Sequence, residues 1–217
     1  MPALLVTGTD TGVGKTFVAC ALAHAWRAAG RRVGVVKPVE TGVEGEPEDA
    51  RRLAAAADDR SPLDDVCPYR LRAPLAPSVA ARLEGVAVDV DRITALIERR
   101  AREVDVLVVE GAGGLLVPIV GTTTYLDLAA RLPLPLIVVA ANRLGTVNHC
   151  ALTVRVAASA RVAVHGFVLS QPTPTTDESA SSNAETIAEM TGLRCLGVLP
   201  HLARPEDAAA RLVLPPG

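Results

Sequence analysis

Residues 4–16, LLVTGTDTGVGKT, decide the fold of this chain because they join an apolar run to a glycine-rich turn and a basic residue. The apolar run predicts a buried strand, and the alanine-rich segment that follows predicts a helix. Gly12 and Gly14 allow backbone N–H groups to curve around phosphate oxygens, and the N-terminus of the helix adds partial positive charge. Lys15 can reach the outer phosphates, and Thr16 can offer its hydroxyl to Mg²⁺. The segment therefore predicts a site for a nucleoside triphosphate and Mg²⁺.

The loop departs at one position from the usual spacing of this motif. Glycine is expected five residues before Gly14, where this chain has Thr9, and the glycine stands one place earlier as Gly8. A glycine-rich turn without a ligand is the alternative interpretation. The preceding strand, the following helix and the adjacent Lys-Thr pair favour phosphate binding.

Length and composition predict one domain with an aliphatic core. The chain has 217 residues, of which 49% are hydrophobic and only 2% aromatic, so small aliphatic side chains must fill the interior. We therefore expect a single domain over residues 1–217. The 22 basic and 24 acidic residues leave a net charge of -2, which favours small-molecule substrates and predicts no nucleic-acid or membrane partner.

The cysteines and the N-terminal sequence predict a cytoplasmic location. The four cysteines are widely spaced and form no CxxC pair, which fits neither a zinc site nor a disulfide framework. We expect reduced, mostly buried thiols at Cys20, Cys67, Cys150 and Cys195. The chain begins without the pattern of a signal peptide, and no apolar run reaches the roughly 18 residues of a membrane span.

Short apolar runs alternate with helical patterns along the chain. The runs are apolar throughout, as in parallel strands that helices cover on both faces. Strands are predicted at residues 3–7, 33–36, 104–109, 134–140, 162–169 and 196–199. Helices are predicted at residues 15–29, 49–56, 90–102, 125–131, 148–160 and 177–191, and irregular stretches at 41–47, 67–77 and 171–177. The predicted fold is a single α/β domain with a doubly wound, mainly parallel sheet flanked by helices.

A second lysine follows the second predicted strand, in the segment KPVETG of residues 37–42. Ligands bind at the carboxyl ends of parallel strands, so Lys37 could face the same phosphates as Lys15. A solvated surface charge is the alternative. The chain has only these two lysines, and a compact ammonium suits charge neutralisation at one oxygen.

Carboxylates at two further positions could hold Mg²⁺. Glu110 ends the apolar run VLVV and precedes the turn GAGG, so it needs a partner or a metal unless it is simply solvated. Asp49 could supply a second ligand from the loop after Lys37, or it could cap a helix. Glu48 beside it is an equal candidate for the metal.

Four segments, in matching order and spacing, resemble the dethiobiotin synthetase family of P-loop nucleoside triphosphatases. They are residues 8–16 (GTDTGVGKT), 37–42 (KPVETG), 110–114 (EGAGG) and 144–149 (LGTVNH). The resemblance spans residues 4 to 202. It implies a homodimeric ligase of biotin synthesis that uses 7,8-diaminopelargonate, CO₂, Mg²⁺ and a nucleoside triphosphate, with ATP expected. The substrate amine would form a carbamate, the carbamate would be phosphorylated, and the second amine would close the ring.

The resemblance also implies a role for each matching residue. Catalytic positions correspond to Lys37, Lys15 and Thr11. The Mg²⁺ ligands correspond to Thr16, Asp49 and Glu110. Nucleotide-binding positions correspond to Gly12, Val13, Gly14, Lys15, Thr16, Phe17, Ser170, Gln171, Pro200 and His201. Substrate-binding positions correspond to Thr41, Gly145, Thr146 and Asn148.

Two departures from the family pattern affect ligand contacts. Gly12 replaces an acidic residue of some members, which removes a side-chain contact. Ser170 and Gln171 stand where some members have an asparagine that reads the base, so adenine selectivity is open. Pro200 and His201 match a loop that flanks the base through its backbone.

The segment of residues 144–149 matches a family element that reaches the neighbouring subunit. There, the amides of a helix N-terminus hold the substrate carboxylate, as helix dipoles favour. Without the resemblance, Asn148 is a helix cap and His149 a surface histidine.

Three other classes compete with this prediction. A regulatory GTPase is suggested by Asn142 to Gly145, although the guanine-reading aspartate is missing. A partitioning or scaffolding switch ATPase would usually carry a second lysine in the phosphate loop, where this chain has Asp10. An amidotransferase would need a further domain.

Overall fold

The computed structural model describes residues 3–175, 177–202 and 204–215. Its main sheet has six parallel strands in the order β10-β9-β8-β1-β5-β2. These strands are β1 (Ala3–Gly8), β2 (Val33–Val36), β5 (Val106–Gly114), β8 (Leu136–Ala141), β9 (Val164–Ser170) and β10 (Cys195–Leu199). Two short pairs lie outside it: parallel β3 (Val39–Thr41) with β4 (Tyr69–Leu71), and antiparallel β6 (Pro118–Val120) with β7 (Thr123–Thr124). The predicted α/β fold is confirmed.

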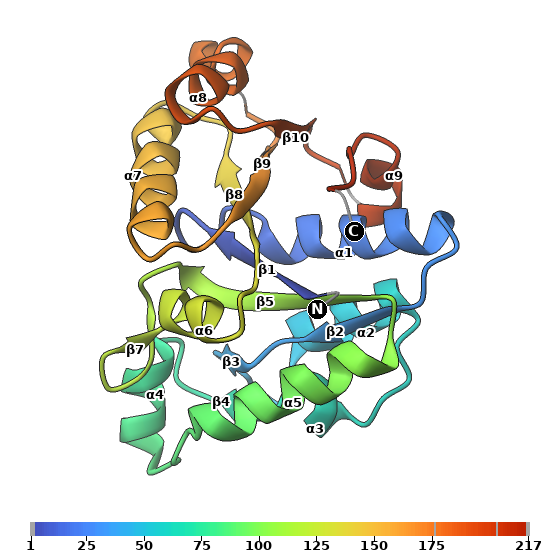
Figure 1. Ribbon diagram of the computed structural model, residues 1–217, viewed down its shortest axis with the longest axis vertical. Helices are drawn as coiled ribbons and strands as arrows, with labels where there is room; N and C mark the ends of the chain where they lie inside the picture. The colour runs from blue at the N-terminus through green and yellow to red at the C-terminus, as the bar shows by residue number, and fades with distance from the viewer. Residues whose placement is uncertain (1–2, 176, 203, 216–217) are drawn as a thin grey trace.

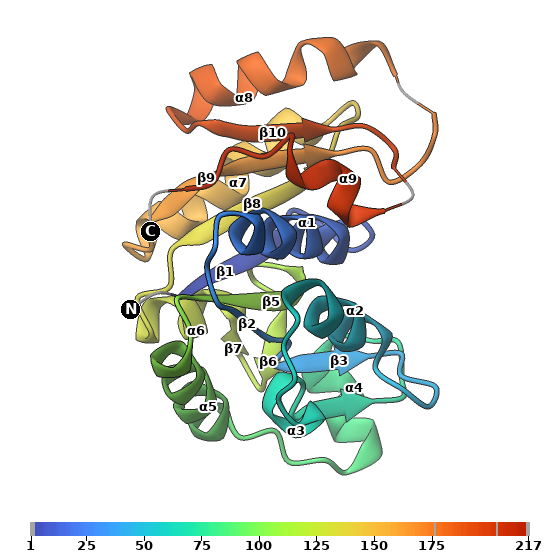
Figure 2. The same ribbon diagram turned by 90° about the vertical axis from the view of Figure 1, so that its right-hand side faces the viewer.

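Helices cover both faces of the main sheet (Figures 1 and 2). One face packs against α1 (Lys15–Ala28), α2 (Glu48–Ala57), α3 (Leu63–Val66) and α9 (Pro205–Ala209). The other packs against α5 (Val90–Glu103), α6 (Tyr125–Arg131), α7 (Thr146–Ser159) and α8 (Asn183–Thr191), with α4 (Pro77–Glu84) against its edge. None of the helices described is long and apolar enough to cross a membrane.

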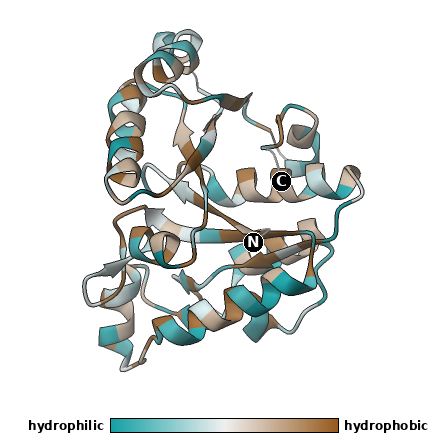
Figure 3. Cartoon of the chain, viewed as in Figure 1, coloured by the Kyte–Doolittle hydropathy of each residue, from teal (hydrophilic) through white to brown (hydrophobic). Residues whose placement is uncertain are grey.

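The strands alternate their side chains between the two helix layers. In β1, Val6 joins the core beneath α1, while Leu5 joins the core beneath α5 and α6. Both side chains are fully buried. Burial on both faces explains why these strands read as uninterrupted apolar runs, which Figure 3 shows as the most hydrophobic part of the ribbon.

Several predicted boundaries were wrong. The helix predicted at 177–191 is divided into a 3₁₀ turn, η1 (Glu178–Ser181), and α8, because serine hydroxyls there bond to nearby backbone carbonyls. The helix predicted at 148–160 begins at Thr146. The stretches predicted as irregular at 41–47 and 67–77 contain the end of β3 and all of β4. The short helices α3, α4 and α9 were not predicted, because four to eight residues carry little periodic signal.

The parallel topology brings the predicted site residues to one edge of the sheet. The phosphate loop follows β1, Lys37 follows β2, and Glu110 lies within β5. Ser170 ends β9, and Pro200 follows β10. Since all these strands point the same way, their carboxyl ends meet.

Candidate nucleotide and metal site

The phosphate loop leaves the N-terminus of α1 open to an anion. Gly14 is the N-cap residue with φ 88°, and neither a side-chain cap nor an acidic residue in the first turn occupies this end. A Cβ atom on Gly14 would lie 2.7 Å from the hydroxyl oxygen of Ser170, so only glycine fits. The free N–H groups and the helix dipole together favour a phosphate.

Lys15 is held inside this loop. Its side-chain nitrogen Nζ donates to the backbone oxygen of Asp10 at 2.9 Å, and the residue is 8% exposed. Burial lowers the pKa of Lys15, an effect that the nearby carboxylate of Glu110 opposes. The ammonium is therefore poorly solvated and gains from an anionic ligand.

Lys37 lies between two carboxylates. Its Nζ atom donates to Oδ2 of Asp49 at 3.0 Å and forms an ion pair with Glu110, whose side chain is 0% exposed. Burial would lower the pKa of Lys37, but Glu110 and Asp49 together raise it well above the ordinary range. The pKa of Asp49, despite its burial, is lowered by Lys37. Lys37 and Asp49 are therefore both charged near neutral pH.

The oxygen donors of this cluster fit Mg²⁺. Thr16 donates its hydroxyl to Oε1 of Glu110 at 2.9 Å, and Oε2 of Glu110 is buried without a hydrogen-bond partner among the described residues. No group of three or more His, Cys, Asp or Glu side chains suited to a metal occurs among the described residues. Mg²⁺ usually takes one or two carboxylates together with substrate phosphates and water, so Thr16, Glu110 and Asp49 form an adequate donor set.

A cavity of about 850 Å³ connects these groups. Most of the predicted site residues line it: Thr11, Gly12, Gly14, Lys15, Thr16, Phe17, Lys37, Thr41, Asp49, Glu110, Ser170, Gln171, Pro200 and His201. The side chain of Val13 is buried in the core instead, and its carbonyl oxygen accepts from Ser170 at the end of β9.

The polar side chains on the β9 and β10 side of the cavity bond to the protein itself. The hydroxyl of Ser170, 3% exposed, donates to Val13, and the amide of Gln171 donates to the carbonyl of Thr175. Nδ1 of His201 lies 3.3 Å from the carbonyl of Gln171. The Ser170 bond joins the end of β9 to the phosphate loop, and the His201 contact joins the loop after β10 to the loop after β9.

Sequence reasoning missed two charged residues that line the cavity, Glu40 and Arg52. Glu40 is 6% exposed on β3, and its carboxylate accepts from the backbone N–H groups of Asp49 and Ala50. Burial raises the pKa of Glu40, while these N–H groups oppose the rise. The available signal was an acidic residue within the segment KPVETG, which follows the second predicted strand.

The alternative roles of Asp49 and Asn148 as helix caps were wrong. Pro47 is the N-cap residue of α2, and Asp49 lies in its first turn. Gly145, with φ 90°, caps α7, where neither a side-chain cap nor an acidic residue is present in the first turn. Gly145, Thr146 and Asn148 do not line the cavity, so the described chain does not bring them to the other predicted site residues.

The segment that suggested a GTPase has a structural role. Asn142 is 6% exposed, and its amide nitrogen donates to the carbonyl of Ala180 at 3.1 Å. Its oxygen accepts from Asn183 at 2.9 Å. Both ends of this buried side chain bond to the protein, so the residue links the end of β8 to η1 and the start of α8.

Fold and site together define a P-loop nucleotide-binding domain. Residues 2–208 match the model of a family described as an AAA domain. In fold the chain is similar to the MinC:MinD cell division protein complex of Aquifex aeolicus, with a TM-score of 0.58 over 94% of this chain and 83% of that chain. The sequence identity is only 12%, so this likeness concerns the fold alone and does not favour the switch-ATPase alternative.

Curated relatives are similar over nearly the whole length. The chain is 51% identical to the ATP-dependent dethiobiotin synthetase BioD of Anaeromyxobacter dehalogenans, over 92% of this chain and 90% of that protein. It is 42% identical to the same-named protein of Aromatoleum aromaticum, over 98% and 97% of the two chains. It is also 42% identical to that of Bacillus cereus, over 94% and 85%. The chain belongs to the dethiobiotin synthetase family, as its motifs predicted.

Proposed function

We propose that this protein is an ATP-dependent dethiobiotin synthetase, which converts 7,8-diaminopelargonate, CO₂ and ATP into dethiobiotin, ADP and phosphate. The observation that carries the proposal is the meeting of Lys15, Lys37 and Thr16 with two carboxylates in one cavity beside the open end of α1. Identity of 51% to a protein of that name supports it.

The reaction would proceed in three steps. One amine of the substrate adds to CO₂ and loses a proton, giving a carbamate. A carbamate oxygen attacks the γ-phosphorus, the bond to ADP breaks, and a mixed anhydride forms. The second amine attacks the carbonyl carbon of that anhydride, phosphate leaves, and the ring closes with release of a proton.

The residues of the chain would act mainly by positioning and charge stabilisation. Lys15 and the loop N–H groups would hold the triphosphate, and Lys37 would neutralise charge on the transferred phosphoryl group. Thr11 and Thr41 would orient the carbamate. When bound through Thr16, Asp49 and Glu110, Mg²⁺ would supply further positive charge to the phosphate oxygens.

We propose a homodimer in which the α7 end of one protomer completes the cavity of its partner. Gly145, Thr146 and Asn148 lie outside their own cavity, and no side chain caps this helix end. Leu144 beside it is 81% exposed and Leu152 on α7 is 54% exposed, an apolar surface that a second copy would cover. A carboxylate at this helix end would be favourable.

A cytoplasmic location is part of the proposal. All four cysteines are free thiols, and burial raises the pKa of Cys150 to about 11. Unpaired thiols persist in reducing compartments, where ATP is also available.

The decisive test is product formation. Purified protein is incubated with diaminopelargonate, bicarbonate, MgCl₂ and each of four nucleoside triphosphates, and dethiobiotin is measured by mass spectrometry. We expect product with ATP and its loss in Lys37→Ala, while the ranking of nucleotides gives the base preference. Triphosphate binding without product from any nucleotide would refute the substrate assignment.

A further inference from the structure

Glu40 forms an unusual clamp between β3 and α2. Its Oε1 atom accepts from the N–H of Asp49 at 3.0 Å, and its Oε2 atom accepts from the N–H of Ala50 at 2.9 Å. Both carboxylate oxygens are thus committed to adjacent backbone donors. Because two parallel hydrogen bonds fix direction as well as distance, the first turn of α2 cannot rotate freely relative to β3.

The clamp replaces the ordinary cap of this helix. The N-cap residue of α2 is Pro47, which has no side-chain hydrogen bond to the helix. The first N–H groups of a helix need acceptors from elsewhere, and a carboxylate near them is also stabilised by the helix dipole. A buried acid from another strand therefore serves as the cap, although nine residues separate Glu40 from Asp49.

Asp49, whose backbone Glu40 holds, is also the residue whose side chain reaches Lys37. Asp49 places Oδ2 3.0 Å from Nζ of Lys37, yet its side chain is 38% exposed. Packing alone does not immobilise a side chain of that exposure. Its backbone N–H bond to Glu40 is what sets the position from which Asp49 reaches Lys37 and the oxygen donors of Thr16 and Glu110.

Glu48, on the same helical turn as Asp49, points away from the site. Glu48 is exposed, does not line the cavity, and has no side-chain hydrogen bond or ion pair with the residues described. Two adjacent carboxylates thus differ because the orientation of the helix turns one inward and the other outward.

We propose that Glu40 is a positioning residue, which holds Asp49 as a ligand for the Mg²⁺ of the nucleotide complex. The inference rests on the proposed function for the identity of the metal. In this role Glu40 does not contact the substrate. Glu40 acts only through its hydrogen bonds to the backbone of α2.

The test compares Glu40→Gln with Glu48→Gln, each of which replaces one carboxylate by an amide. Glu40 lines the cavity, whereas Glu48 is exposed and does not line it. Mn²⁺ serves as the probe, and its binding in the presence of a non-hydrolysable ATP analogue is measured by electron paramagnetic resonance. We expect Glu40→Gln to weaken Mn²⁺ binding about tenfold or more, as loss of a group that orients a metal ligand does. Glu48→Gln should bind Mn²⁺ like the unaltered protein.

Two further measurements separate positioning from a general loss of structure. Affinity for the analogue without metal should be unchanged in Glu40→Gln. In an Asp49→Asn background, Glu40→Gln should cause no additional loss of Mn²⁺ affinity, because it acts through Asp49. If Glu40→Gln does not fold, Glu40→Asp, which keeps the charge but shortens the reach, is put through the same comparison.

The outcomes are distinct. Equal Mn²⁺ binding by the Glu40 and Glu48 variants, or additive losses with Asp49→Asn, would overturn the proposal. Absence of dethiobiotin from the unaltered protein would instead refute the proposed function, and the Mn²⁺ measurements would still decide the role of Glu40.

Discussion

The N-termini of α1 and α7 are built alike but have different surroundings. Each begins after a glycine with positive φ, Gly14 at 88° and Gly145 at 90°, and each lacks a side-chain cap and an acidic first turn. Both follow strands of the same sheet at its carboxyl edge (Figure 1). At α1 the fold adds Lys15, Lys37 and Glu110 within one cavity, whereas the α7 end does not line that cavity.

The difference shows that a helix end supplies the donors for an anion but not a complete site. Around the α1 end, Lys37 follows β2, Glu110 lies within β5 and Asp49 lies on α2 of the same chain. For the α7 end, we propose that a second copy of the chain supplies the rest of the site. Substitutions at the two ends therefore have separable effects on nucleotide and substrate.

The largest effect is expected from Lys37→Ala. This substitution removes a buried positive charge that lies in the cavity at the α1 end, which the α7 end does not line. Loss of one preorganised charge at the reacting group should lower kcat roughly a hundredfold to a thousandfold. It should also destabilise the fold by about 3–5 kcal/mol, because Glu110 would remain buried without its partner. Dethiobiotin formation and urea unfolding measure the two effects.

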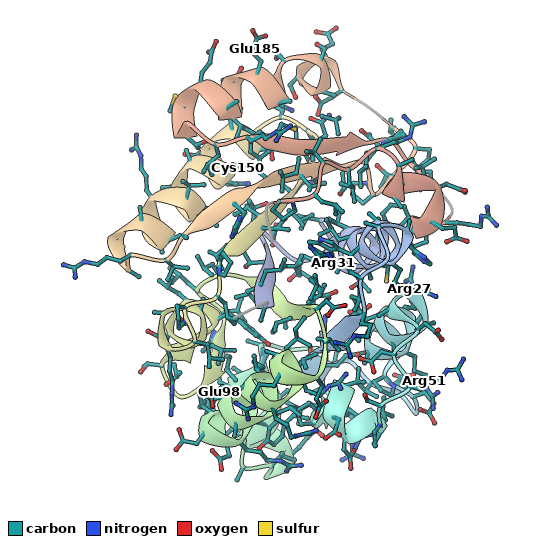
Figure 4. All side chains as sticks on the ribbon, turned by 45° about the vertical axis from the view of Figure 1, so that its right-hand side comes forward. Arg27, Arg31, Arg51, Glu98, Cys150 and Glu185 are labelled. Atoms are coloured by element: carbon teal, nitrogen blue, oxygen red, sulfur yellow. The ribbon has the colours of Figure 1, made fainter. Side chains whose placement is uncertain are left out.

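The matched control is Arg31→Ala, which removes one positive charge from an exposed residue beyond the end of α1, labelled in Figure 4. It should leave both quantities near their original values. An active Lys37→Ala enzyme would mean that the α1 end needs only the phosphate loop.

The two cap glycines provide the next comparison. A Cβ on Gly14 would lie 2.7 Å from the hydroxyl oxygen of Ser170, whereas no described atom lies within 4 Å of a Cβ on Gly145. Backbone strain and overlap together should lower the nucleotide affinity of Gly14→Ala about tenfold to a hundredfold. Gly145→Ala should lose only about 1–2 kcal/mol of stability through positive φ. Calorimetric titration with a non-hydrolysable nucleotide and thermal unfolding distinguish the variants.

A strong loss of activity in Gly145→Ala, with nucleotide affinity intact, would show that another chain or the substrate occupies the space beside that residue. This result would support a substrate site shared between two protomers. Weak effects on all measurements would indicate a helix end without a ligand.

Asn148→Asp tests the anion site of α7 with almost no change of shape. A carboxylate in the first turn should stabilise the helix by about 0.3–1 kcal/mol through the dipole. It should also compete with the substrate carboxylate and raise the KM for diaminopelargonate by about tenfold, equivalent to 1.4 kcal/mol, with the KM for ATP unchanged. A more stable protein with unaltered KM would exclude Asn148 from the substrate site.

The smallest effect concerns Arg52, which lines the cavity one helical turn after Asp49. Arg52→Ala should raise the KM for ATP about threefold to fivefold, because an exposed charge near phosphate is screened by solvent. Arg51→Ala is the control, since Arg51 extends away from the protein in Figure 4 and pairs with Glu46. Equal KM values for the two variants would remove Arg52 from the nucleotide site.

Much of the fold followed from local sequence. Unbroken aliphatic runs predicted the buried parallel strands, and the loop between Gly8 and Thr16 predicted the phosphate-binding turn. The family motifs predicted membership in the dethiobiotin synthetase family, which the relatives confirm. The strands and the phosphate-binding turn can be predicted from the sequence because periodicity and glycine geometry depend on a few neighbouring residues.

The tertiary structure decided which residues meet. Lys37 and Glu110 are 73 positions apart, and Thr16 and Glu110 are 94 apart, so their contacts depend on how β2, α1 and β5 pack. The choice of Asp49 over Glu48 depends on the rotation of α2, which Glu40 sets from another strand. Local sequence alone specifies the chemical groups and the strand ends that carry them. Packing at the carboxyl edge of the sheet orients these groups, because side-chain direction depends on contacts between segments distant along the chain.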